Sequence, residues 1–214
     1  MNFCSKEEVF RILENMCHVI RSNEKYLNDL DSVIGDAEHG SNLKKAMEES
    51  LQKIKTLTCD SPFELIRIFG ATMASSGCGS GPLLYGLAIR AFGRSLAEAG
   101  SFDPMSVARG LREALNTVKT RGGSEVGDKT MVDALEPAVQ AFEEAVHQGK
   151  SLVEAFAKAV EAAEEGMLLT STLVGKKGRG SYLGERGVGH QDPGATSMYL
   201  LLASVYQTLA GKEL

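Results

Sequence analysis

Apolar residues recur along this chain at the spacing of an α-helix, whereas the alternating pattern of a β-strand is nearly absent. Near the N-terminus, one helical face carries Val9, Ile12, Leu13, Met16 and Ile20. The pattern predicts about eight helices, near residues 5–28, 40–57, 62–76, 82–99, 104–120, 130–148, 151–168 and 193–210. A chain built only of helices must bury its apolar faces helix against helix, so we expect an all-α protein.

Capping residues and prolines mark where these helices begin. Ser5 and Glu8 have the spacing of a capping box, and Ser61 precedes a later helix in the same way. Four prolines stand at the start of a helical pattern, where the missing N–H costs nothing: Pro62, Pro82, Pro104 and Pro193. Pro137 alone falls inside a pattern, where it should kink the helix or mark a late start. The connections are mostly short, which favours antiparallel neighbours and hence a bundle.

The composition is that of an ordinary acidic globular protein. The 214 residues include 23 Lys and Arg against 28 Asp and Glu, for a formal net charge of −5, and 43% of them are hydrophobic. A chain of this size can bury most of its unfolded surface in one core. We find no domain-sized linker and no internal repeat, so residues 1–214 are predicted to form a single domain. The negative balance argues against nonspecific nucleic-acid binding.

The chain carries no pattern typical of membrane insertion or export. Its most apolar stretch, residues 198–205, is far shorter than the roughly 20 residues that cross a bilayer. The first residues carry acids where a signal peptide needs a basic and then an apolar run. The four cysteines have neither a CxxC pair nor zinc-type spacing: Cys4, Cys17, Cys59 and Cys78. A cytoplasmic protein with reduced thiols is expected.

Many of the 23 glycines gather in four places that are not ordinary linkers: 35–40, 77–86, 122–127 and 175–194. The first loop brings three carboxylates, Asp31, Asp36 and Glu38, within eight residues. Three clustered carboxylates repel one another unless a cation or protons relieve them. Hard oxygen ligands without thiolates favour Mg²⁺, Ca²⁺ or Mn²⁺ over zinc. A solvated acidic turn is the alternative.

The second loop runs through Gly77, Cys78, Gly79 and Ser80 into a helix that starts near Pro82. Small residues let backbone N–H groups approach an anion, and the helix dipole favours phosphate there. The loop lacks the Gly-Lys-Ser/Thr ending of a P-loop, and a flexible turn between helices is the alternative. Cys78 is a candidate nucleophile, although a structural thiol fits better because no histidine stands beside it in the sequence.

The third and fourth loops, residues 122–133 and 178–194, are polar and glycine-rich. The fourth is long enough for a lid or a binding loop, and its Arg179 and Arg186 suit anionic oxygens. His39 and His190 can act as acid or base groups or simply form hydrogen bonds, whereas His18 and His147 are read as structural. Together the four loops indicate a Mg-nucleotide site at one end of the bundle.

Four ordered stretches carry a more specific signal: Gly35-Asp36-Ala37-Glu38-His39-Gly40-Ser41-Asn42, Gly79-Ser80-Gly81-Pro82-Leu83, Gly127-Asp128-Lys129-Thr130-Met131-Val132-Asp133, and residues 178–186 followed by Gly189-His190-Gln191-Asp192-Pro193-Gly194-Ala195. Over nearly the whole chain these stretches resemble the L subunits of dihydroxyacetone kinases.

The resemblance implies an eight-helix antiparallel barrel that binds ADP or ATP at one end through two Mg²⁺ ions. By motif position the metal ligands would be Asp31, Asp36 and Glu38. The nucleotide would lie against twelve residues: His39, Gly40, Ser41, Asn42, Gly79, Ser80, Gly122, Met131, Arg179, Asp192, Pro193 and Gly194. No residue of this chain would act as a nucleophile, because in such proteins a separate K subunit holds the sugar on one of its histidines.

The implied reaction is γ-phosphoryl transfer from the Mg-nucleotide to dihydroxyacetone. In the branch that resembles bacterial phosphotransferase-system kinases, ADP stays bound and a phosphohistidine of an M subunit recharges it. In the other branch ATP exchanges freely. We favour the branch in which ADP stays bound for this chain. We expect the K subunit to dock on the rim around Arg179, Arg186 and His190, and a homodimer is also compatible with the resemblance.

The chain departs from the family pattern in a few places. Glu38 stands where the family usually has Asp, Cys78 stands where it commonly has Gly, and a leucine is added before Tyr85. The extra methylene of Glu38 bears on metal affinity, and these changes leave room for another small ketose or triose as substrate. Two further readings compete: a nucleotide-binding regulatory module that contacts a transcription factor or sensor, and a Ca²⁺-binding structural bundle.

Overall fold

The computed structural model describes residues 5–212, so Cys4 lies outside the described residues. Within them the chain forms nine α-helices and three short 3₁₀-helices, with no strand. The α-helices are α1 (Lys6–Ser22), α2 (Glu24–Ile34), α3 (His39–Lys55), α4 (Pro62–Ser75), α5 (Ser80–Ala99), α6 (Pro104–Gly122), α7 (Val132–His147), α8 (Leu152–Leu169) and α9 (Pro193–Leu209). The predicted all-α class is confirmed.

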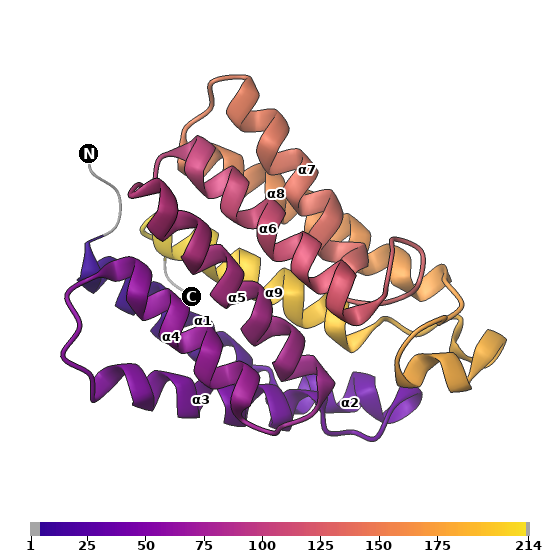
Figure 1. Ribbon diagram of the computed structural model, residues 1–214. Coiled ribbons are helices and arrows are strands. Elements are labelled where there is room, and N and C mark those ends of the chain that lie inside the picture. The colour runs from indigo at the N-terminus through magenta and orange to yellow at the C-terminus, as the bar shows by residue number, and fades with distance from the viewer. Residues whose placement is uncertain (1–4, 213–214) are drawn as a thin grey trace.

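The helices are arranged in a ring. From α3 to α9 each helix packs on the next, α1 packs on α3, and α9 returns to pack on α1, which closes the ring. Neighbouring helices run in opposite directions, so α3, α5, α7 and α9 all begin at the right-hand end of the view in Figure 1. The barrel-like bundle that the sequence predicts is therefore present.

Local capping explains most helix starts. Ser5 and Glu8 form the expected capping box, and Ser151 with Glu154 forms a second one. The side chains of Ser61, Asp103 and Asp192 each accept an N–H at the start of their helices, just before Pro62, Pro104 and Pro193. A side-chain oxygen at this position satisfies a donor that the helix leaves unpaired.

The prediction of one helix over residues 5–28 is wrong. The helix breaks at Asn23, whose side-chain amide donates to the Val19 carbonyl at 2.8 Å. Such local side-chain bonds compete with the helical ladder and favour a break. A second helix, α2, then continues to Ile34, and this places Asp31 in the last turn of α2 instead of in a loop.

Pro137 lies inside α7 without ending it. Its ring nitrogen cannot donate to the carbonyl of Asp133, four residues earlier. Gly166 of α8 lies against that carbonyl oxygen so closely that an added Cβ would collide with it. The helices α7 and α8 therefore approach each other closely at the Asp133 carbonyl, which lacks its usual hydrogen bond within α7.

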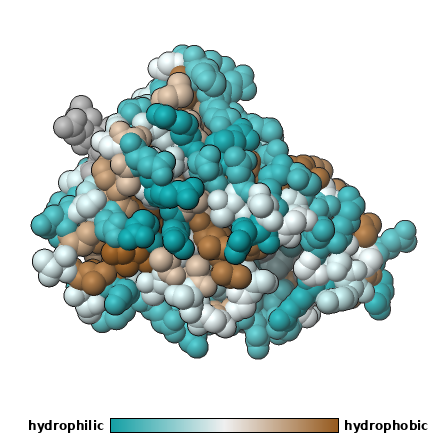
Figure 2. All heavy atoms as spheres, in the orientation of Figure 1, coloured by the Kyte–Doolittle hydropathy of each residue, from teal (hydrophilic) through white to brown (hydrophobic). Residues whose placement is uncertain are grey.

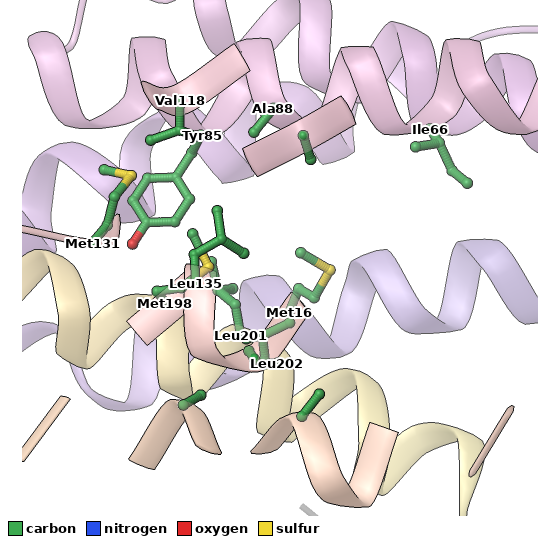
Figure 3. Packing of buried hydrophobic residues seen from close by; sticks show 14 of the residues in the cluster. Met16, Ile66, Tyr85, Ala88, Val118, Met131, Leu135, Met198, Leu201 and Leu202 are labelled. Atoms are coloured by element: carbon green, nitrogen blue, oxygen red, sulfur yellow. The ribbon is translucent and has the colours of Figure 1, made fainter. Parts of the chain in front are cut away.

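The inside of the ring is apolar. Tyr85 on α5, Met131 before α7 and Met198 on α9 point into the same interior space (Figure 3). A cavity of about 160 Å³ remains there, lined by apolar faces of side chains from α1, from α4 to α9 and from Phe102 in the α5–α6 connection. The surface seen in Figure 2 is mostly hydrophilic, with hydrophobic residues in separate areas. No helix among residues 5–212 is long and apolar enough to cross a membrane.

Candidate functional site

The starts of four helices meet at one end of the ring. His39, the first residue of α3, has its Nε2 2.8 Å from Ser197 Oγ in the first turns of α9. A Cβ built on Gly81 of α5 would lie 3.7 Å from the His39 ring, and one on Gly194 of α9 would lie 3.4 Å from the N atom of Met131, which precedes α7. Helix starts carry unpaired N–H groups and a partial positive charge, so this end of the ring is suited to anions.

A buried hydrogen-bond network fixes these helix starts relative to one another. The hydroxyl of Tyr85 on α5 donates to the Gly194 carbonyl at 2.9 Å and lies 2.7 Å from Ser197 Oγ. Burial raises the pKa of Tyr85, so this hydroxyl keeps its proton. Burial also lowers the pKa of His39 to about 4 against the opposing charge of Asp31, so its imidazole is neutral at pH 7.

The first glycine loop wraps around the carboxylate of Asp31. Asp31 Oδ2 accepts the backbone N–H groups of Glu38 at 3.0 Å and His39 at 3.2 Å. A Cβ on Gly35 would collide with the Asp31 side chain, 2.8 Å from Cγ, and Ala37 adopts a left-handed backbone with φ 63°. Only glycine at position 35 therefore allows the loop to turn so closely around this acid.

The other two acids of the predicted metal set point to different partners. Asp36 forms an ion pair with Arg179, which lies in the segment between α8 and α9. Glu38 accepts a hydrogen bond from the Asn42 side chain at 3.4 Å. Among residues 5–212 no group of three or more His, Cys, Asp or Glu side chains is arranged to hold a metal ion. In this structure the guanidinium of Arg179 is the cation beside Asp36.

The donor atoms nevertheless suit magnesium in kind. All three acids offer carboxylate oxygens, which Mg²⁺ prefers. Asp31 lies at the C-terminal end of α2, where the helix dipole favours a cation, and its Oδ1 accepts no hydrogen bond within the described part of the chain. The metal role of Asp31, Asp36 and Glu38 stays a prediction.

Three of the predicted nucleotide contacts start α3 together with His39. Gly40 is buried, and a Cβ there would lie 2.9 Å from the Asn28 side chain on α2. The Ser41 hydroxyl accepts a hydrogen bond from Asn28 at 2.7 Å, so it is turned towards α2. Asn42 bonds to Glu38, as described above. These contacts attach the start of α3 to α2.

The remaining predicted contacts lie at the other helix ends. Gly79 caps α5 with φ 92° and nothing within 4 Å of an added Cβ, and the exposed Ser80 follows it. Gly122 ends α6 against Leu84 of α5. Met131 is buried immediately before α7. An open glycine turn beside a helix start is the kind of place where a phosphate can reach backbone N–H groups.

Asp192 and the residues after it build the start of α9. Asp192 Oδ2 accepts the Ala195 N–H at 2.7 Å, and its own N–H donates to Thr170 Oγ1 at 3.0 Å. Burial raises the pKa of Asp192 to about 7; Asp133 adds to this and Lys129 opposes it. The capping residue of α9 is thus a buried carboxyl group, and the charges of Asp133 and Lys129 act on its pKa in opposite directions.

Sequence reasoning missed four residues that organise this end of the ring: Tyr85, Lys129, Asp133 and Ser197. Asp133 accepts the backbone N–H groups of Gly127 at 2.6 Å and Thr130 at 2.7 Å, which shapes the third loop. The stretch 127–133 was noticed, but nothing in its pattern indicates which side chains turn inward. Tyr85 and Ser197 have no sequence signal at all, because their contact joins residues 112 positions apart.

Three other residues singled out from the sequence are Cys78, Arg186 and His190. Cys78 is buried and its thiol donates to the Ser76 carbonyl at 3.6 Å, as expected for a structural thiol. Arg186 and His190 are exposed in the segment between α8 and α9. The docking role suggested for Arg179, Arg186 and His190 stays a prediction.

The model of the DAK2 domain matches residues 33–207, which include all four loops. The chain belongs to the DAK2 domain family. The chain is 34% identical to the "PEP-dependent dihydroxyacetone kinase, ADP-binding subunit DhaL" of Escherichia coli (strain K12), over 98% of this chain and 99% of the relative. It is 35% identical to the "PEP-dependent dihydroxyacetone kinase 1, ADP-binding subunit DhaL" of Listeria innocua, over 95% of this chain and 96% of the relative. The resemblance drawn from the motifs is confirmed.

A solved structure shares the fold. The dihydroxyacetone kinase of C. freundii, crystallised in complex with AMP-PNP and Mg²⁺, superposes with a TM-score of 0.69 at 27% identity. The similarity covers 93% of this DAK2 chain and 33% of the C. freundii chain, so this chain spans about a third of that kinase.

Proposed function

We propose that this protein is the nucleotide-binding subunit of a dihydroxyacetone kinase and transfers a phosphoryl group from a Mg-nucleotide to dihydroxyacetone. The observation that carries the proposal is the meeting of four helix starts, those of α3, α5, α7 and α9, beside the acidic segment 31–38, which spans the end of α2 and the loop after it. Helix starts favour the negative charge of phosphates, and carboxylates favour the metal that travels with them. A polyphosphate chelated by a divalent cation needs both at once.

In this proposal the phosphates lie against the backbone N–H groups of residues 39–42, 79–80 and 192–194. Gly122 and Met131 border the remainder of the nucleotide. The neutral imidazole of His39 can donate or accept a hydrogen bond without adding charge, because its other nitrogen is already held by Ser197. Tyr85 keeps Ser197 and the start of α9 in place. The protein's contribution is thus mainly preorganised dipoles around developing negative charge.

Asp31, Asp36 and Glu38 would hold the metal. Magnesium would neutralise charge on the nucleotide's phosphates and on the group being transferred. Arg179, which bonds to Asp36 here, is placed to supply a second positive charge when its partner is engaged by a metal. Arginine suits this role because its planar fork binds anionic oxygens and stays protonated. Two metal ions, as the resemblance implies, are part of the proposal.

The acceptor sugar and the phosphoryl donor lie outside this chain in the proposal. A K subunit presents dihydroxyacetone, and a phosphohistidine of an M subunit recharges bound ADP. The PEP-dependent relatives of E. coli and L. innocua, both named as ADP-binding subunits, support this branch over exchange of free ATP. No nucleophile is required here, which agrees with the buried, hydrogen-bonded state of Cys78.

Titration calorimetry of the protein and of its Asp36→Asn variant with Mg-ADP tests the proposal. The wild-type protein should bind, and the variant should lose binding while keeping its helical circular dichroism, because the change removes ligand charge from a loop and no core volume. Asp60→Asn is the matched control, since the Asp60 side chain is 97% exposed and its only ion pair among residues 5–212 is with Lys6. Unchanged affinity of Asp36→Asn would refute the site, and absence of wild-type binding would refute the proposed function and favour the structural reading.

A further inference from the structure

Lys129 is a buried lysine whose ammonium is surrounded by backbone carbonyls. The residue is 2% exposed and has a left-handed backbone with φ 62°. Its Nζ donates to the carbonyl oxygens of Thr170 at 2.8 Å, Leu173 at 3.2 Å, Gly187 at 2.8 Å and His190 at 2.5 Å. A non-glycine residue keeps this strained conformation only where its surroundings enforce it.

The four carbonyls belong to the two ends of one loop. We call residues 170–192, between α8 and α9, the long loop. Thr170 and Leu173 lie where it leaves α8, and Gly187 and His190 lie where it approaches α9. The residues in between, 174–186, include Arg179, which reaches Asp36 across the site. One ammonium therefore joins both ends of the loop that carries this arginine.

The chemistry of the contact calls for a cation. No carboxylate oxygen in the described part of the chain lies within 4.0 Å of the Lys129 ammonium, so its partners are carbonyls alone. Hydrogen bonds from a charged donor are stronger than neutral ones, and removing the donor would take this partner from all four carbonyls. Those of Thr170 and Gly187 would keep only the backbone N–H groups of Leu173 and His190, at 3.2 and 3.4 Å. Burial lowers the pKa of Lys129, while Asp192 and Asp133 raise it and so favour the charged form.

Two weaker contacts support the same join. The Lys176 N–H donates to the Asp128 carbonyl at 3.0 Å, and the Gly189 N–H donates to the Ser171 carbonyl at 2.7 Å. Both involve backbone groups, and the first attaches the long loop to the residue next to Lys129. These backbone contacts and the ammonium of Lys129 therefore attach the same loop to the same part of the protein.

We propose that Lys129 is a positioning residue for nucleotide binding: its ammonium fastens both ends of the long loop and so holds Arg179 at the site. Lys129 itself contacts no nucleotide in this account. The inference rests on the proposed function for its consequence, but the fastening of the loop is independent of any ligand and can be tested without one.

Limited digestion with trypsin in the absence of nucleotide tests the fastening. The long loop offers four cleavage points in exposed positions: Lys176, Lys177, Arg179 and Arg186. The variant Lys129→Met should be cut there at least about tenfold faster than wild type, as expected if loop opening becomes easier by about 1.4 kcal/mol. Lys158→Met is the matched control, because Lys158 is exposed on α8 and, within the described part of the chain, forms an ion pair only with Glu161. Equal cleavage rates for Lys129→Met and wild type would overturn the proposal.

A double-mutant cycle with Mg-ADP tests whether Lys129 acts through Arg179. Lys129→Met and Arg179→Gln should each weaken binding, and Lys129→Met should have less than about a twofold further effect once Arg179 is gone. If Lys129 only stabilised the fold in general, the losses of Mg-ADP affinity in the two single variants would multiply in the double variant. Multiplying effects would therefore overturn the positioning role, whereas failure of the wild-type protein to bind Mg-ADP would refute the proposed function and leave the trypsin result standing.

Lys129→Gly covers the case in which Lys129→Met does not fold. Glycine adopts φ 62° without strain, so this variant removes the cation and keeps the backbone. n-Butylammonium, which matches the lost side chain, should restore part of the trypsin resistance, and n-butanol should not. Resistance equal to wild type without any additive, or equal rescue by the alcohol, would contradict a role for the positive charge.

Discussion

Replacement of Gly86 by alanine probes how closely α4 and α5 must pack to place the start of α5 at the site. A Cβ built on Gly86 would lie 2.6 Å from the Gly70 carbonyl oxygen and 2.8 Å from the Ala74 Cα, and closer still to the Ala74 nitrogen. These are backbone atoms of α4, so no side chain can turn away. Because ordinary carbon contacts begin near 3.5 Å, the two helices would have to separate by about 1 Å.

Two opposing effects decide the sign of the change. Alanine gains about 1 kcal/mol over glycine inside a helix. Overpacking a tight contact costs about 1–3 kcal/mol, and the upper end applies here because the obstacle is backbone. We therefore expect Gly86→Ala to lower the free energy of unfolding by about 2 kcal/mol, which for a chain of this size lowers Tm by about 4–8 °C.

Thermal unfolding followed by circular dichroism measures this loss. Gly110→Ala is the matched control, because a Cβ there would meet only the partly buried ring of Phe92, at 2.7 Å, and that ring can shift. The control should lose clearly less stability than Gly86→Ala. A Gly86→Ala protein as stable as wild type would refute the argument that backbone contact sets the α4–α5 distance.

Two further predictions concern the buried groups at the helix starts. The pKa of Asp192 is raised from 3.8 to about 7, so the native protein holds a proton that the unfolded chain releases, and the contribution of Asp192 to stability should fall as pH rises from about 4 to 7, while the lowered pKa of His39 contributes in the opposite direction. Asp192→Asn keeps the capping oxygen and removes only this contribution, so in urea unfolding between pH 4 and 7 the stability of wild type should fall relative to that of the variant as pH rises; a stability difference that does not change with pH would contradict the assignment. Tyr85→Phe should lower the free energy of unfolding by about 1 kcal/mol, since Ser197 still donates to the Gly194 carbonyl at 3.1 Å. Identical melting of Tyr85→Phe and wild type would show that the hydroxyl holds nothing in place.

Helix positions could be predicted because they depend on local chemistry. The starts at Pro62, Pro104 and Pro193 follow from a capping side chain beside a proline, and the structure has them at those residues. The break at Asn23 could not be predicted, because the same asparagine in a helix interior costs little when its side chain points to solvent. Here the amide returns to the Val19 carbonyl instead.

The sequence predicts the candidate site as four loops at one end of the bundle, but not the side-chain contacts within it. Glycine-rich stretches before helix starts indicated anion binding, and the helices bring those starts together. Which side chains turn inward depends on contacts between distant residues, such as Lys129 with His190 and His39 with Ser197. The pairing of Asp36 with Arg179 is of the same kind. It gives one acid of the predicted metal set a cationic partner from the protein itself.

Hydrogen exchange of backbone amides with and without Mg-ADP tests the central claim most directly, because it reports where the nucleotide binds. We predict added protection at residues 36–42, 79–81, 129–133 and in the long loop, reversed by EDTA, with little change at the opposite end of the ring. Protection confined to other surfaces, or protection that persists in EDTA, would contradict a metal-dependent nucleotide site at the meeting of the four helix starts.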